Sequence, residues 1–451
     1  MDPNVEPWIY ALFYPYAMDF YVKIEKDRIQ YIRDYQKEIR ADTYKGLHDY
    51  MENAATDVNA RIGKTIILPS TFIGSPGHMQ QCYQDAMAIV SEKGKPCLFL
   101  TMTCNPKWKE IEENLLPHQQ AADRPDLCAR IFDLKKQRLL DFVIKNKYFG
   151  GVAAYVYVIE FKKRGLPHMD LLITLKHGFK ITTPEIVDRF ISAEIPNANE
   201  TVMDGNGYPY YRRRDNGTTH EQSNGRIVDN RWAVPYCPTL LEMFNCHINV
   251  EAVSSIRAVK YMYKYIYKGH DAANVVLTEQ NEERVINHDE IKDYLEARYV
   301  VSVEAAYRIL SKLLQDKSHC IIRLPIHLPM QYTIIIPNDL TNVQVNLDQF
   351  TSMILDYFKL NSEDENARQY LYKDIPCDYV HKKNKVTKIT QWGPRKGQFN
   401  VFGRIRSVNP SEFELFHLRL LLLNVKVATS SDALKTVDGQ LLPSFSAACL
   451  A

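Results

Sequence analysis

Two apolar runs joined by a short basic turn constrain the fold of this chain more than any other feature. The first run covers residues 152–161, the turn is Lys-Lys-Arg-Gly at 162–165, and the second run covers residues 168–175. Runs of this length around a glycine-containing turn predict two antiparallel strands that form a β-hairpin. A further apolar run and two segments of helical periodicity lie upstream, at 96–101, 79–92 and 126–145. Their alternation predicts an α+β or α/β fold.

The length of 451 residues predicts two or three domains rather than one compact core. We expect a helical N-terminal arm over residues 1–65, a core over 66–275 and a mixed α/β C-terminal region over 276–451. In the arm, an aromatic, proline-punctuated stretch to Tyr16 precedes a predicted amphipathic helix at 19–51. The elements predicted in the C-terminal region are a strand at 332–336 and helices at 342–358 and 368–372.

Composition excludes several classes of protein. No run reaches the ~18 consecutive apolar residues of a membrane-spanning helix, and the N-terminus lacks the features of a secretory signal. Nine cysteines without a C-x-x-C pair favour reduced thiols over a disulfide framework or a zinc ribbon. We therefore expect an intracellular protein without a membrane partner.

The net charge is only +2, so contacts with nucleic-acid phosphates must come from local basic surfaces. The basic runs at 212–214 and 382–385 are weak candidates, because short charge runs are usually solvated.

The second strand of the predicted hairpin carries a candidate metal site. Side chains alternate between the two faces of a strand, so His168 and Asp170 share one face. Glu160 on the first strand lies beside them in some registers of the hairpin, and the sequence does not determine the register. One imidazole and two carboxylates suit Mg²⁺ or Mn²⁺. The alternative is a half-buried strand with a polar outer face and no metal.

A tyrosine-rich segment at 254–268 is predicted to be a helix that ends before Gly269. Tyr261 and Tyr265 are four residues apart and fall opposite the apolar face of this helix. Basic residues follow the edge of the apolar face: Arg257, Lys260, Lys264 and Lys268. A phenol oxygen can attack a phosphodiester and hold the released strand covalently, with a metal ion or lysines neutralising the charge that develops. The alternative is a helix that docks on another domain through its tyrosines.

The hairpin and the tyrosine helix carry a resemblance to a known family. Glu160-Phe161-Lys162-Lys163-Arg164-Gly165-Leu166-Pro167-His168, followed by Lys264-Tyr265-x-x-Lys268-Gly269, resembles the replication-initiator part of Helitron rolling-circle transposases. Further stretches occur in the order that the family has them, among them Thr103-Cys104-Asn105-Pro106-Lys107-Trp108 and Asn245-Cys246-His247-Ile248-Asn249. On these stretches the resemblance extends through nearly the whole chain.

The resemblance implies a His-hydrophobic-His (HUH) endonuclease, whose antiparallel sheet is flanked by helices and corresponds here to residues 66–275. It implies that His168 is the first ligand of Mg²⁺ or Mn²⁺, that Glu160 is a third ligand, and that Tyr261 and Tyr265 are the nucleophiles. Asp170 stands where the family has its second histidine. The implied partner is single-stranded DNA at transposon ends, in the nucleus.

The chain also departs from the family. It is shorter than the family pattern after Tyr16 and after Glu200, and its 451 residues contain no helicase or ATPase motif, which complete relatives carry. We expect a truncated transposon initiator that nicks and rejoins single-stranded DNA. The alternative is a catalytically dead, DNA-binding remnant of a Helitron transposase.

Overall fold

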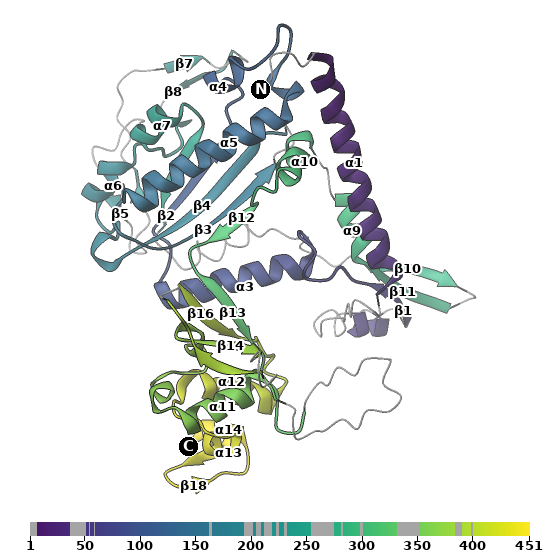
Figure 1. The fold of residues 1–451 in the computed structure, drawn as a ribbon, viewed down its shortest axis with the longest axis vertical. Coiled ribbons are helices and arrows are strands. Elements are labelled where there is room, and N and C mark those ends of the chain that lie inside the picture. Colours follow the sequence, from purple (N-terminus) through teal and green to yellow (C-terminus); the bar gives the residue numbers. More distant parts are fainter. Residues whose placement is uncertain are drawn as a thin grey trace. The chain divides into compact units, whose positions relative to one another are not determined.

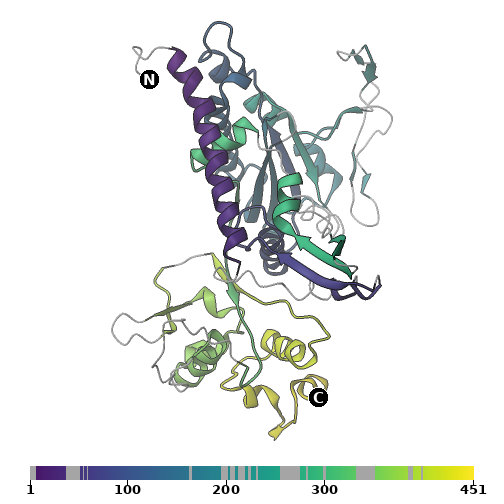
Figure 2. The same cartoon turned by 90° about the vertical axis from the view of Figure 1, so that its right-hand side faces the viewer.

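The computed structural model describes residues 7–36, 51–53, 55–57, 59–161, 165–193, 202–203, 209–211, 219–221, 225–229, 232–253, 275–280, 283–297, 301–331, 351–383, 390–397 and 400–451. The chain divides into two compact units, Met1–Lys317 and Ser318–Ala451. Figures 1 and 2 show the elements of each unit. The division into 1–65, 66–275 and 276–451 stays a prediction. None of the helices in the described part of the chain is long and apolar enough to cross a bilayer.

A five-stranded antiparallel sheet forms the centre of the first unit, which makes this unit α+β. Its strand order is β12-β3-β4-β2-β9. The bounds of the strands are β2 Leu98–Thr103, β3 Val152–Phe161, β4 Pro167–Leu175, β9 Ile248–Ala252 and β12 Gln315–Lys317. β3 and β4 are the predicted hairpin. Every residue of β4 is buried, as is typical of a strand at the centre of a sheet.

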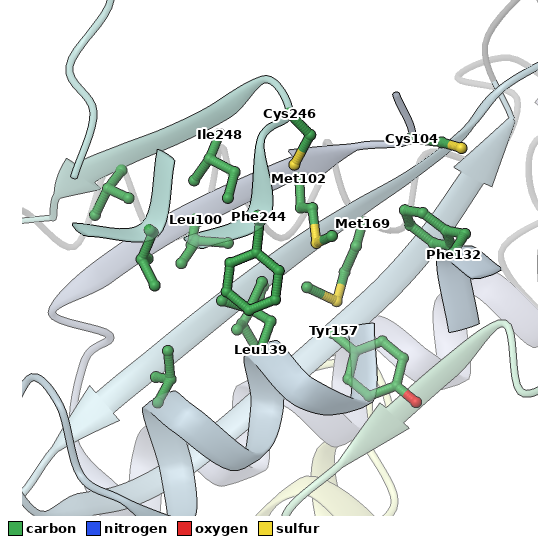
Figure 3. Close-up of a cluster of buried hydrophobic side chains, with 14 of the residues drawn as sticks. Leu100, Met102, Cys104, Phe132, Leu139, Tyr157, Met169, Phe244, Cys246 and Ile248 are labelled. Carbon is green, nitrogen blue, oxygen red and sulfur yellow. The ribbon is translucent and has the colours of Figure 1, made fainter. Parts of the chain in front are cut away.

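Helices cover one face of this sheet and bury its apolar side chains. α5 (Pro125–Leu140) and α10 (Ser302–Ile309) contribute Phe132, Leu139 and Tyr307 to a core that includes Met169 and Leu171 of β4. Figure 3 shows this cluster between the strands and α5. Pro125 occupies the first turn of α5, where its missing N–H costs no hydrogen bond. α5 continues into a π-helical turn, Asp141–Lys145, so the predicted helix at 126–145 is confirmed.

The opposite face of the sheet contacts α3 (Pro76–Lys93) along the β12–β3 edge. Ser75 caps α3 by accepting a hydrogen bond from the N–H of His78 at 3.0 Å. Lys317 Nζ of β12 lies 2.7 Å from Asp85 Oδ2, and Gln315 donates to Cys82 Sγ at 3.2 Å. The remaining short elements of this unit are α4 Lys109–Glu112, α6 Pro184–Phe190, α7 Pro238–Phe244, β5 Val202–Met203, β6 Pro209–Tyr210, β7 Thr219–Glu221 and β8 Ile227–Asp229.

The N-terminal helix α1 runs from Pro7 to Asp34. It therefore begins earlier than the predicted helix at 19–51, and residues 37–50 lie outside the described part. The aromatic stretch is helical too. Pro7 stands at the first helical position, where its missing N–H costs no hydrogen bond, whereas Pro15 lies in the helix interior, where a proline removes one. α1 packs through Ile29 and Ile32 on a small core next to a three-stranded sheet. The neighbouring elements are β1 Arg61–Ile66, β10 Val275–Gln280, β11 Glu283–Asp289 and α9 Glu290–Ala297.

The second unit has its own core around Tyr357, Tyr372 and Leu422. The predicted helix at 342–358 corresponds to α11, which begins at Met353 because Ser352 caps it, accepting from the N–H of Leu355. The helix predicted at 368–372 is mostly wrong, because a short 3₁₀ helix ends at Gln369. The strand predicted at 332–336 lies outside the described residues. The bounds are α11 Met353–Glu363, α12 Phe413–Asn424, α13 Ser431–Lys435, α14 Phe445–Leu450, β13 Cys320–Leu324, β14 Tyr379–Lys383, β15 Thr390–Pro394, β16 Val401–Ile405, β17 Thr436–Val437 and β18 Gln440–Leu441.

Candidate metal site

The central strand β4 places His168 and Asp170 on the face of the sheet away from α5. His168 Nε2 lies 3.2 Å from Asp170 Oδ1. Only 6% of the His168 side chain and 1% of the Asp170 side chain are exposed. Met169, between them, points into the apolar core on the other face. The alternation of β4 thus produces a buried imidazole–carboxylate pair.

The neighbouring strands add polar groups to the same face. In the register of the hairpin Glu160 of β3 lies directly opposite His168, which brings these two residues together on one face. Thr103 of β2 lies opposite His168 on the other side. The Thr103 hydroxyl is 2.7 Å from His168 Nδ1, and this hydrogen bond leaves Nε2 directed toward Asp170.

The carboxylate of Asp170 is the unusual feature of this face. Both of its oxygens are buried, and neither accepts a hydrogen bond from any residue that the structure describes, because the 3.2 Å approach of His168 Nε2 to Oδ1 does not have hydrogen-bond geometry. Asn249 of β9 contributes a third such atom, Oδ1, and Thr101 lies between Asn249 and Asp170 in the strand pairing. A buried acceptor without a donor costs about 1–3 kcal/mol, and more when it is charged. A bound cation would remove this cost, so the donor set fits a divalent metal ion.

The ligand set is incomplete when protein side chains alone are counted. Among the described residues no three His, Cys, Asp or Glu side chains converge closely enough to hold one ion. Glu160 therefore shares the face with His168 and Asp170 without forming such a group with them. An ion held by His168 and Asp170 would take its other ligands from water or from phosphate oxygens, as Mg²⁺ commonly does.

The predicted nucleophiles and the basic stripe lie outside the described residues. These are Tyr261, Tyr265, Arg257, Lys260, Lys264 and Lys268, all within the span 254–274. The arginine run at 212–214 is also outside, as are residues 384–385 of the lysine-rich run, whereas Lys382 and Lys383 belong to β14. The distance from the tyrosines to His168 thus stays a prediction.

Sequence reasoning missed two residues of this face, Thr103 and Asn249. Thr101 and Thr103 alternate along β2, and His247 and Asn249 alternate near β9, in the same way as His168 and Asp170. These patterns were available in the sequence. Only the strand order β4-β2-β9 shows that they share one surface.

Comparison with known proteins gives one family. Residues 7–173 match the family model described as "Helitron helicase-like domain at N-terminus". This part of the chain is thus similar to a transposon-associated domain, and it includes β3 and the His168–Asp170 pair of β4 but not the tyrosine segment. The comparison with curated proteins gave no match.

Proposed function

We propose that this chain is a transposon initiator of the HUH type that nicks and rejoins single-stranded DNA with the help of Mg²⁺ or Mn²⁺. The observation that carries the proposal is the buried His168–Asp170 pair, whose carboxylate oxygens have no donor among the described residues. Its position on an antiparallel sheet, within a Helitron-related domain, supports the same reading. His168 and Asp170 would hold the ion.

The proposed reaction balances without an external oxidant or energy source. The phenol oxygen of Tyr261 or Tyr265 attacks the phosphorus of a phosphodiester, the bond from phosphorus to the 3′ oxygen breaks, and that oxygen takes up a proton. The 5′ phosphate stays attached to the tyrosine until a 3′ hydroxyl attacks it and releases the phenol. His168 and Asp170 would hold a divalent ion, which would supply positive charge to neutralise the phosphate oxygens. Lys260, Lys264, Lys268 and Arg257 would hold the strand through its phosphates.

A covalent adduct tests this function directly. The purified chain, mixed with Mn²⁺ and labelled single-stranded DNA, is expected to give a protein–DNA band that survives SDS. The double variant Tyr261→Phe/Tyr265→Phe should lose this band, and Asp170→His, which restores the family's residue, should strengthen it. If neither the wild type nor Asp170→His forms an adduct with any strand tested, the nicking activity is rejected.

Thr103 provides a second prediction for the same site. Thr103→Val removes the hydroxyl that orients His168, and loss of such an orienting hydrogen bond typically weakens metal binding about 10–100-fold. Thr103→Ser keeps the hydroxyl and should bind Mn²⁺ nearly as well as the wild type. Titration of Mn²⁺ against the three proteins measures the effect. Equal Mn²⁺ affinity in the valine and serine variants would contradict the orienting role.

A catalytically dead, DNA-binding remnant is the second candidate function. The observation that favours it is burial, because the His168 and Asp170 side chains are only 6% and 1% exposed. Catalysis would require the DNA phosphate to reach an ion held by these buried side chains. This candidate predicts DNA binding that weakens steeply with added salt and no adduct under any condition. Binding that is independent of salt would count against it.

A further inference from the structure

Helix α1 carries an exposed stripe of large side chains on the side away from its own core. The stripe consists of five residues, Tyr16, Phe20, Ile24, Tyr31 and Tyr35, whose exposed fractions are 68%, 54%, 36%, 54% and 44%. At about 100° per residue they fall within an arc of about 100°. The buried residues Ile29 and Ile32 pack on Leu68 and Ile291. Ile29 projects from the side opposite the stripe, and Ile32 lies about 110° from the centre of the stripe. Among the described residues, α1 packs through the side that carries Ile29 and Ile32, and the stripe is left uncovered. Figures 1 and 2 show α1 beside the other elements of its unit.

The spacing of the stripe is symmetric about its centre. Tyr16 stacks on Phe20 with ring centroids 6.3 Å apart, and Tyr31 stacks on Tyr35 at 4.5 Å. The first pair lies as far before the midpoint of residues 25 and 26 as the second pair lies after it. A two-fold axis through that midpoint would place each aromatic pair against the opposite pair of an antiparallel second helix. A surface that is complementary to itself in this way is the requirement for a two-fold symmetric dimer.

Charge and area agree with this pairing. Lys23 lies at the edge of the stripe and Asp27 within its arc, on the same side of its centre line. Both are exposed, and neither has an ion-pair partner among the described residues. The same axis would bring Lys23 of one copy within about 1.5 Å, along the helix axis, of the level of Asp27 of the other. With about 100 Å² exposed on each aromatic residue, the two stripes would bury roughly 1,000 Å² in total, near the lower limit for a specific interface.

We propose that the α1 stripe is a docking surface for a second copy of this chain, which pairs with it as an antiparallel helix. The interface does not depend on the proposed nuclease activity. Its area is at the low end for a specific interface, so we expect a transient dimer rather than a permanent one. Two chains held in this way would present two copies of the Helitron-related domain to one nucleic acid.

Sedimentation velocity of the full chain from 1 to 100 micromolar tests the proposal. The wild type is expected to shift from monomer to dimer, and Phe20→Glu should raise the dissociation constant at least tenfold. Val22→Glu is the matched control, because Val22 is 49% exposed on the same helix but lies off the stripe. A wild type that stays monomeric throughout this range, or an equal effect of the two variants, would overturn the proposal.

Charge reversal and crosslinking test the register. Lys23→Asp and Asp27→Lys should each weaken the dimer, and the double reversal should restore it.

In a Cys320→Ser background, which removes the exposed native thiol, a mixture of Phe20→Cys and Tyr31→Cys proteins should form a disulfide-linked dimer. Phe20→Cys alone should not, because its two copies would lie about 16 Å apart along the helices. Equal crosslinking by Phe20→Cys alone would overturn the antiparallel pairing.

Discussion

Replacing Asp170 by asparagine is expected to stabilise the metal-free protein and to abolish its stabilisation by Mn²⁺. In the metal-free protein the buried carboxylate lies 3.2 Å from His168 Nε2 but accepts no hydrogen bond from the described residues, and its neutral isostere avoids the cost of burying charge. We expect the free energy of unfolding to rise by about 1–3 kcal/mol. Mn²⁺ at a hundred times its dissociation constant should stabilise the wild type by about 2.7 kcal/mol, and the variant hardly at all.

Thermal or denaturant unfolding, with and without Mn²⁺, measures both effects in the same protein. Asp141→Asn is the control, because the Asp141 side chain is 54% exposed and forms a surface ion pair with Lys145 at 2.8 Å. Such a surface change is expected to move the free energy of unfolding by less than about 0.5 kcal/mol and to leave the Mn²⁺ response intact. If Asp170→Asn destabilises the metal-free protein and keeps the Mn²⁺ response, Asp170 is a structural residue and not a ligand.

The hairpin was predictable because its signals are local. The apolar runs and the glycine-containing turn lie within 24 consecutive residues, and the structure reproduces both strands within one residue. The start of α11 was not predictable to the same degree, since the decisive contact is the cap that Ser352 makes. The start of α1 differs from the prediction because Pro15 lies in the helix interior, a position that the missing N–H of a proline normally disfavours.

The candidate site was only partly predictable, for a reason of distance along the chain. His168 and Asp170 follow from the alternation of a single strand. Thr103 reaches His168 across 65 residues of sequence, and Asn249 belongs to a strand that joins the sheet still later. Strand order and register are set by packing of the whole sheet, which a single sequence does not reveal. The pairing of Glu160 with His168 was open for another reason, because the register of a hairpin depends on the type and length of its turn.

Replacing Asp133 by alanine is expected to cost about 3–5 kcal/mol in the free energy of unfolding, because it leaves a buried ammonium group unpaired. Asp133 on α5 lies 2.7 Å from Lys136 Nζ, with only 3% and 4% of the two side chains exposed. Lys312 Nζ lies 2.7 Å from the other carboxylate oxygen, and Tyr307 donates to the carboxylate at 3.2 Å. The Asp133 carboxylate therefore links α5 to α10 through Tyr307, and to the segment after α10 through Lys312.

Glu113→Ala is the control for this loss, and pH provides an independent check. Glu113 pairs with Lys109 at 3.4 Å while 61% exposed, so its removal should cost less than about 1 kcal/mol.

Burial raises the pKa of Asp133, but Lys136 and Lys312 outweigh burial and the pKa lies below its usual value. A lowered pKa stabilises the fold above the ordinary carboxyl range and loses that effect as pH falls through the folded-state pKa. The difference in stability between wild type and Asp133→Ala should therefore shrink in acid, and a difference that stays constant down to pH 2 would show that the loss arises from packing rather than charge.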